Sequence, residues 1–307
     1  MSPSSVFVEA LDSVELGSSQ TFRNLTVFPL YAHSPREADY ITLDEALAKE
    51  WVHITEIGEG GSVPELSLVN DGPSSVLLLD GEELIGAKQN RVLNLTILVA
   101  ANSKLVIPVS CVESGRWNRV SRHFAASPHT QFAQGRAAKM RNVTESLTNS
   151  GTRRSNQHEV WQAIAEKSSR LGAESRTHAM AAMFEKVETT VEDFVRAFAP
   201  DARQVGAVFA VNGRVAGLEL FDAPSTWRKL APKLVRSYAV DAIDRNGAPG
   251  ELHSDQARRF MTVVAASPTS QFAATGMGTD VRVAAADIAA AALVAEGRTV
   301  HLSAFAN

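Results

Sequence analysis

The sequence predicts an α+β fold, with a mainly antiparallel β-sheet in its N-terminal part, central helices, and a β-hairpin with helices in its C-terminal part. Short apolar and β-branched runs separated by turn residues fill the first hundred positions, as is typical of antiparallel strands. Apolar residues at steps of three and four from Met180 to Phe198 indicate helix. Asn212-Gly213 between two apolar runs is a strong hairpin signal.

In the N-terminal part, we expect one helix among the strands. Thr42 and Glu45 have the spacing of a capping box, which predicts a helix over residues 43–51. Turn sequences such as Asp80-Gly81 divide the apolar runs. The predicted strands are residues 21–31, 52–57, 65–69, 76–79, 83–87, 92–99 and 104–112.

Residues 125–158 lose the apolar pattern and are rich in Ser, Thr, Asn, Gln, Gly and Arg. We therefore expect a long polar loop, which in a compact domain is usually functional or disordered. Between residues 118 and 158, seven basic residues against one acid give a local charge of +6, on a chain whose net charge is −4. Such a positive zone suits a phosphate-bearing ligand or a short nucleic acid, although a polar loop that happens to be Arg-rich is the plain alternative.

Helices and strands return after this segment. A Thr189-x-x-Glu192 box divides the apolar stripe into two helices that end before Pro200, and Ser225 is the expected cap of the helix that follows the hairpin. The predicted helices are residues 159–171, the two in 180–198, 226–243 and 255–266, and the predicted strands are 204–211, 214–221, 281–285, 288–294 and 299–305.

This pattern gives three regions of one compact unit: a mainly β region over 1–124, the Arg-rich loop over 125–158, and an α+β region over 159–307. Two pairs of similar segments at similar offsets suggest an internal duplication, with chance as the alternative: residues 125–133 with 265–273, and Asp80-Gly81 with Asn212-Gly213.

The single cysteine, Cys111, excludes an intramolecular disulfide framework. The N-terminus has no signal-peptide pattern, and no apolar run approaches the roughly 20 residues of a membrane helix. We therefore expect a cytoplasmic protein that does not use a membrane. The eight histidines are not spaced for a shared metal face, so no metal site is expected, and no motif identifies a cofactor.

The stretch from Asp80 to Trp117 is the candidate site. Between two predicted strands, the four side chains of residues 88–91 can converge on an anionic or hydroxylated ligand, unless they are only a solvated turn. Arg116 would add a phosphate contact, and Trp117 could stack on a base or cover the core. The ligand-binding candidates are Lys88, Gln89, Asn90, Arg91, Asn94, Arg116 and Trp117.

The catalytic candidates are Glu82, Cys111 and Glu113. Strand alternation places Cys111 and Glu113 on one face, so Glu113 is either a general base or half of an ion pair with Lys88, Arg91 or Arg116. Because Glu82 and Glu83 point to opposite faces, at most one of them can join Glu113. Cys111 is either a nucleophile or a small buried hydrophobe.

Residues 80–94 (DGEELIGAKQNRVLN) and 107–117 (IPVSCVESGRW) resemble the signature of the ARG and Rhodanese-Phosphatase-superfamily-associated protein domain. The resemblance is sharp over about 40 residues and extends loosely over most of the chain. It implies a role near ADP-ribose, NAD or nucleotide processing, because the family's name records neighbourhood with ADP-ribosylglycohydrolases and phosphatases. It implies no catalytic residue.

Two functions of different classes follow. The first is binding or processing of a phosphorylated nucleotide-like ligand related to ADP-ribose or NAD. There, Lys88, Arg91 and Arg116 would contact phosphates, and Glu82 or Glu113 would act as acid or base if the ligand is turned over. The second is a non-catalytic adaptor whose Arg-rich loop orders on a partner protein or a short RNA. The sequence does not decide whether the protein is an enzyme.

Overall fold

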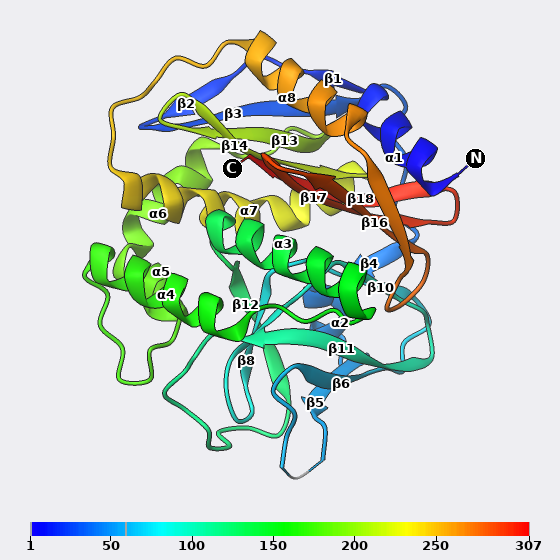
Figure 1. Cartoon of the computed structure of the whole chain (residues 1–307), viewed down its shortest axis with the longest axis vertical. Helices are drawn as coiled ribbons and strands as arrows, with labels where there is room; N and C mark the ends of the chain where they lie inside the picture. Colours follow the sequence, from blue (N-terminus) through cyan, green and yellow to red (C-terminus); the bar gives the residue numbers. More distant parts are fainter. Residues whose placement is uncertain (1, 59, 307) are drawn as a thin grey trace.

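The computed structural model describes residues 2–58 and 60–306. Within them the chain forms eight helices and eighteen strands, and the predicted α+β class is confirmed. The strands are antiparallel to their neighbours except for β4 (Tyr40–Thr42) and β7 (Ser75–Leu78), which pair in parallel. Two lobes result, which we name the large-sheet lobe and the small-sheet lobe (residues 40–130) (Figure 1).

The large-sheet lobe contains a nine-stranded sheet. Its strands come from both ends of the chain, and the predicted Asn212-Gly213 hairpin joins two of its central strands. Asn212 and Gly213 both have positive φ values, 52° and 74°, as the tight turn requires. In spatial order the strands are β1 (Val14–Leu16), β3 (Leu25–Ala32), β13 (Gln204–Val211), β14 (Arg214–Phe221), β18 (Arg298–Ala306), β17 (Ile288–Ala295), β16 (Thr279–Ala285) and β15 (Thr269–Ala273), with β2 (Gln20–Phe22) paired to β3.

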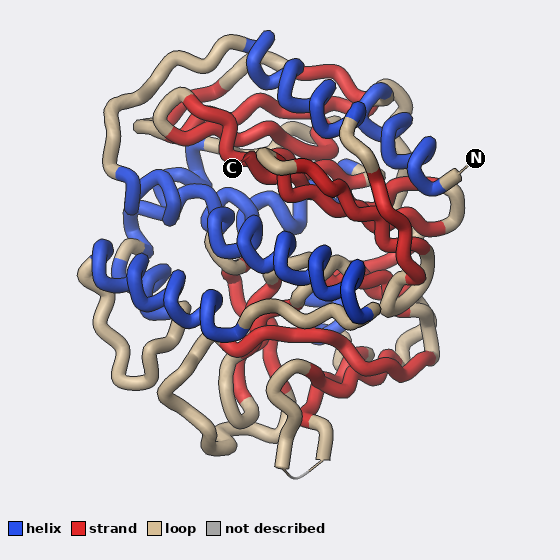
Figure 2. Tube along the Cα trace, viewed as in Figure 1, coloured by secondary structure: helices blue, strands red, loops and turns tan. Residues whose placement is uncertain are grey.

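Helices cover both faces of this sheet (Figures 1 and 2). The buried side chains of α1 (Pro3–Asp12) and α8 (Ser254–Ala266) share one apolar cluster with one face of the sheet. Helices α7 (Pro224–Arg245) and α3 (Ala133–Ser150) contribute to the cluster on the other face. Helix α1 was not predicted from the sequence, although Ser2 as N-cap and a proline at the first helical position are ordinary start signals.

The small-sheet lobe packs two sheets around a separate apolar cluster. Helix α2 (Leu43–Ala48) begins with the predicted capping box of Thr42 and Glu45. The predicted strand 92–99 is two strands, because the chain passes from one sheet to the other at residues 94–96. The six-stranded sheet runs β12 (Phe124–Thr130), β8 (Glu82–Gly86), β9 (Arg91–Leu93), β11 (Ser103–Cys111), β6 (Glu65–Asn70) and β5 (Val52–Glu56); the three-stranded sheet runs β10 (Ile97–Val99), β7 and β4.

Two helix caps differ from the prediction. The apolar stripe is divided into α5 (Ala181–Lys186) and α6 (Glu188–Ala197) as expected, but α6 begins at Glu188, so Thr189 lies inside it. Helix α7 begins with a proline at its first position, whose fixed φ suits a helix start, so Ser225 lies in the first turn and is not the cap.

The prediction of a polar loop over residues 125–158 is wrong. The segment forms β12, the 18-residue helix α3 and the start of α4 (Gln157–Leu171). Helical periodicity is hidden because α3 buries Gly135, Arg136 and Lys139 as well as apolar residues. The charges of Arg136 and Lys139 are paired with buried carboxylates, so the core-facing side of this helix cannot be recognised from its hydropathy.

The predicted region boundaries also differ from the structure. Strand β3, to which β1 and β2 are paired, pairs in turn with β13 from the C-terminal half of the chain, so residues 1–124 are not one β region. The central apolar cluster takes side chains from both lobes, among them Leu77, Val92, Met140 and Phe209, as one compact unit requires. No helix among the described residues is long and apolar enough to cross a membrane.

The segments that suggested a duplication have different structures. Asp80-Gly81 connects β7 and β8, which belong to different sheets, whereas Asn212-Gly213 closes a hairpin. Residues 125–130 all lie in β12, but of their counterparts 265–270, residues 265–266 lie in α8 and only 269–270 in a strand, β15. The two similarities therefore do not mark equivalent elements of the fold.

Candidate functional site

The turn between β8 and β9 is the centre of the candidate site. Gly86 ends β8 with φ +125°, and a Cβ there would lie 2.5 Å from the Ser121 Oγ. The Ser121 hydroxyl accepts a hydrogen bond from the Ala87 N–H at 2.8 Å. The loop of residues 114–123, which we name the Trp117 loop, therefore closes directly on the turn, and glycine is required where the two meet.

Arg116 fixes this loop to the turn. Its Nε and Nη2 bind the Glu113 carboxylate at 2.8 and 2.6 Å, and its Nη1 donates to the Ala87 carbonyl at 2.9 Å. Nη2 also donates to the Asn90 Oδ1 at 2.9 Å. Every nitrogen of this guanidinium therefore has a partner within the protein.

Glu113 is held as a carboxylate. Burial opposes its ionisation, but hydrogen bonds from Arg116 and from the Asn90 N–H (3.1 Å) outweigh burial and lower the pKa of Glu113. Its backbone carbonyl accepts from the Gln89 side chain. Of the two roles considered for Glu113, this geometry favours the structural ion pair, with Arg116 as the partner.

Arg91 is fully buried and only half satisfied. Its Nη1 donates to the Gln89 carbonyl and Oε1 at 3.0 and 2.9 Å. Its Nε and Nη2 have no hydrogen-bond partner among the described residues, and the nearest carboxylate oxygen, Glu56 Oε1, lies 3.7 Å from Nη2. That distance is too long for a hydrogen bond, so one edge of the fork lacks an acceptor.

The indole of Trp117 covers this guanidinium. Its ring centroid lies 5.4 Å from the Arg91 Cζ and 5.5 Å from the Lys88 Nζ, which are cation–π distances. Trp117 is 48% exposed, whereas Arg91 has no exposed surface. The other basic side chains of the Trp117 loop, Arg119 and Arg122, are exposed.

Cys111 lies opposite Arg91 in the ladder of β9 and β11. Burial raises the pKa of Cys111 to about 11, and the nearby Arg91 only partly offsets this. Its backbone N–H and carbonyl are both bound by the Gln157 side chain, each at 2.8 Å. A thiol with this pKa is protonated at neutral pH, so the geometry favours a buried small side chain over a nucleophile.

Two candidates lie away from this cluster. Glu82 accepts from the Lys233 Nζ at 2.8 Å, and the same ammonium binds Asp44 at 2.7 Å. Asn94 donates to the Arg153 carbonyl at 2.9 Å and accepts from the Ser110 hydroxyl at 2.6 Å. Neither joins the residues around Arg91.

Glu83 was not among the predicted site residues, although the sequence placed it beside Glu82 as a possible neighbour of Glu113. One oxygen of this buried carboxyl accepts from the Ser127 hydroxyl at 3.0 Å, and the other has no partner among the described residues. Burial raises the pKa of Glu83 to about 7; the Ser127 hydrogen bond opposes this, while Glu113 and Glu185 add to it. Strand alternation allowed at most one of Glu82 and Glu83 to lie near Glu113. Glu83 is that residue, because the charge of Glu113 adds to its raised pKa, whereas Glu82 pairs with Lys233.

Asp80 belongs to a second cluster, the interlobe network. It binds Lys139 Nζ at 2.7 Å and Arg136 Nε at 3.3 Å, and Arg136 binds Glu219 with its other nitrogens. Gly81, at φ +81°, allows this approach, since a Cβ would lie 2.9 Å from the Arg136 Cδ. These cations outweigh burial and lower the pKa of Asp80.

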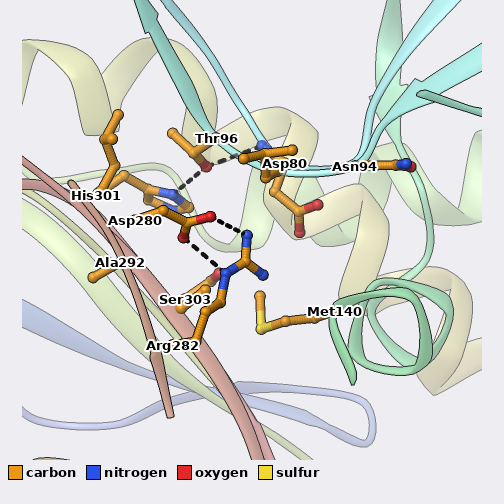
Figure 3. Close-up of a pocket in the computed structure, with 12 residues that line it drawn as sticks. Asp80, Asn94, Thr96, Met140, Asp280, Arg282, Ala292, His301 and Ser303 are labelled. Atoms are coloured by element: carbon orange, nitrogen blue, oxygen red, sulfur yellow. Dashed lines mark hydrogen bonds and ion pairs between the residues drawn. The ribbon is translucent and has the colours of Figure 1, made fainter. Parts of the chain in front are cut away.

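A small cavity adjoins this network (Figure 3). Asp280 binds Arg282 through two contacts of 2.7 and 2.8 Å on its wall. The cavity has about 10 Å³ of space for water, which is room for about one water molecule. Its polar lining residues are Asp80, Asn94, Thr96, Asp280, Arg282, His301 and Ser303.

No group of three or more His, Cys, Asp and Glu side chains within residues 2–58 and 60–306 is arranged to hold a metal ion. Comparison with curated proteins gave no match, and comparison with solved structures also gave none. The family model of the ARG and Rhodanese-Phosphatase-superfamily-associated Protein domain matches residues 13–305, which is nearly the whole chain. The chain therefore belongs to the family of this domain, as the motif around Arg91 and Arg116 indicated.

Proposed function

We propose that the protein binds a small phosphorylated, nucleotide-like ligand related to ADP-ribose or NAD, in the cytoplasm, through Arg91 and Trp117. The observation that carries the proposal is the buried Arg91 guanidinium whose Nε and Nη2 lack acceptors. Leaving buried donors unpaired costs roughly 1–3 kcal/mol each, and more for a charged group. Such a group in a folded protein calls for an external partner.

The geometry of the free edge indicates an oxyanion. In a guanidinium, Nε–H and one Nη2–H point in parallel from the same edge, and this edge binds a phosphate or carboxylate through two hydrogen bonds. The same edge of Arg116 holds the Glu113 carboxylate, through a hydrogen bond from Nε and an ion-pair contact from Nη2 to the same oxygen. Arg91 presents the same edge, and no carboxylate of the described residues lies at hydrogen-bonding distance from it.

Trp117 supports the nucleotide-like part of the ligand. A half-exposed indole over a cation offers a flat surface on which a base can stack, and such stacking contributes about 1–3 kcal/mol per base. The exposed Arg119 and Arg122 of the same loop add positive charge beside it. For an anion to reach Arg91, the part of the Trp117 loop that Arg116 does not hold would have to move away from the guanidinium.

A thermal-shift panel tests the proposal with ADP-ribose, NAD, cyclic phosphates and mononucleotides as probes. A ligand at 100 times its Kd stabilises the fold by about 2.7 kcal/mol. We expect Arg91→Met to abolish this stabilisation and Trp117→Ala to weaken binding, whereas Arg214→Met on the exposed start of β14 leaves it unchanged. If Arg91→Met does not fold, Trp117→Ala decides, because its side chain is half exposed.

Absence of stabilisation by every probe would overturn the proposal, as would binding that persists in Arg91→Met. The alternative, a non-catalytic adaptor that binds a partner protein or a short RNA through its Arg-rich segment, has less support from the fold. It required a disordered Arg-rich segment, whereas residues 133–150 are helical and Arg136 and Lys139 are buried in ion pairs.

A further inference from the structure

Thr96, His301 and Glu219 form a continuous hydrogen-bonded chain at the cavity between the lobes. The Thr96 Oγ1 lies 2.8 Å from the His301 Nδ1, and the His301 Nε2 lies 3.1 Å from the Glu219 Oε2. The three residues come from the turn before β10, from β18 and from β14. Figure 3 shows the Thr96 hydroxyl meeting the imidazole at one end of the cavity.

The direction of each proton in this chain follows from its ends. An ionised carboxylate only accepts hydrogen bonds, so the His301 Nε2 carries the hydrogen that Glu219 binds. If the imidazole is neutral, its lone pair is on Nδ1 and the Thr96 hydroxyl donates to it. A hydroxyl aimed at a basic ring nitrogen, with the opposite N–H held by a carboxylate, is the arrangement that activates a nucleophile.

Contacts with other residues fix each of the three members of this hydrogen-bonded chain. Glu219 is bound by Arg136 and accepts from the Tyr238 hydroxyl at 3.3 Å. The His301 ring stacks on Phe221 with 4.5 Å between centroids. The Thr96 Oγ1 also accepts from the Asp80 N–H at 3.1 Å, which leaves its own hydrogen for His301.

The surroundings limit what could react there. His301 and Glu219 are buried, whereas Thr96 is partly exposed and lines the cavity together with His301. The cavity beside it has room for about one water molecule, which restricts the acyl part of a substrate to a short chain. Arg282 lines the same cavity, where its Nε and Nη2 are bound by Asp280.

We propose that Thr96 is the nucleophile of a second site, independent of Arg91, that hydrolyses small acyl esters. Thr96 Oγ attacks the carbonyl carbon while its proton passes to the His301 Nδ1. The ester C–O bond then breaks, and the alcohol leaves with that proton. Water attacks the resulting acyl-threonine, His301 takes the proton of the water, and a carboxylic acid and free Thr96 are formed. Glu219 is the positioning residue that keeps the imidazole in the reactive tautomer.

Incubation with p-nitrophenyl acetate tests this inference, with release of nitrophenol and peptide mass spectrometry as readouts. We expect an acetyl group on Thr96 and turnover that falls at least about 100-fold in Thr96→Val, the size of effect that loss of nucleophile or base produces. His301→Gln should have the same effect. Ser303→Ala is the matched control, because Ser303 lines the same cavity but is not part of the hydrogen-bonded chain from Thr96 to Glu219. The long-chain decanoate ester should react far more slowly than the acetate.

Glu219→Gln should lower kcat with little change in KM, since it changes the orientation of the imidazole and not the position in which the ester binds. Thr96→Val removes only the hydroxyl of a partly exposed side chain, so it decides the question even if variants of the buried residues do not fold. Turnover that is unchanged in Thr96→Val would overturn the inference. Failure to find either turnover or an acetyl adduct on Thr96 in the wild-type chain would overturn it too.

Discussion

Replacing Glu83 with glutamine should stabilise the protein at and above neutral pH. Glu83 is a buried carboxyl with one oxygen bound by Ser127 and the other without a partner among the described residues. Burial raises its pKa to about 7, from an ordinary value of 4.5. Glutamine has nearly the same shape, can still accept from the Ser127 hydroxyl, and never becomes charged.

The magnitude follows from the two pKa values of Glu83. Between pH 4.5 and about 7, the folded chain keeps a proton that the unfolded chain has released, so stability falls as the pH rises through this window. Each pH unit is worth about 1.36 kcal/mol, which gives a total loss of about 3 kcal/mol. Below pH 4.5 both states are protonated and this loss is absent. Glu83→Gln avoids the loss, so it should be about 3 kcal/mol more stable than wild type at pH 8 and nearly equal to it at pH 4.

Urea unfolding followed by tryptophan fluorescence, at several pH values from 4 to 8, measures this difference. Glu185→Gln is the matched control: Glu185 adds to the high pKa of Glu83 but is itself exposed, so it should show only a small change with pH. If the free energies of Glu83→Gln and wild type differ by a constant amount across the range, Glu83 is not the buried, proton-retaining carboxyl described above.

Three further changes have definite expected outcomes. Lys139→Met should destabilise the fold by about 3–5 kcal/mol in urea unfolding, because it leaves a buried aspartate without its nearest cation. Gly206→Ala should cost at least about 2 kcal/mol, since its Cβ would lie 2.2 Å from the Glu219 carbonyl oxygen, whereas Gly60→Ala, with no atom within 4 Å, should stay within about 0.5 kcal/mol. The Cys111 thiol, with its pKa raised by burial to about 11, should resist iodoacetamide at pH 8 in the folded chain and react once urea unfolds it; rapid labelling without urea would contradict this.

The elements that the sequence predicted are those whose local signals agree with their environment. The Asn212-Gly213 hairpin and the capping box of Thr42 are decided by residues next to each other in the chain, and both are confirmed. Helix α3 was missed because its inward side carries Arg136 and Lys139, whose partners come from distant segments. Hydropathy cannot identify a buried face that is made of paired charges.

Only part of the candidate site could be predicted, again because several of its residues have partners in distant segments. Alternation continued past the end of β11 indicated that Glu113 needs a cationic partner, but three cations were near in sequence, and only the fold selects Arg116. Glu82 and Glu83 could not be distinguished without the lysine of α7, Lys233, that pairs with Glu82. Glu56 and Ser127 were not considered, because they lie far from the motif in sequence and reach it through sheet pairing.

Strand β8 explains why polar residues are so dense in this part of the chain. At its start, Asp80 joins the two lobes through Arg136 and Lys139, and at its end the turn is pinned by Arg116. Most of these polar groups therefore satisfy one another, and their density alone does not indicate a ligand. What distinguishes Arg91 is the opposite property: a buried charge with hydrogen-bonding capacity that the described chain leaves unused. On this criterion the proposed binding function rests on one guanidinium edge and the indole that covers it, and the other polar residues of the motif form the framework that holds them in place.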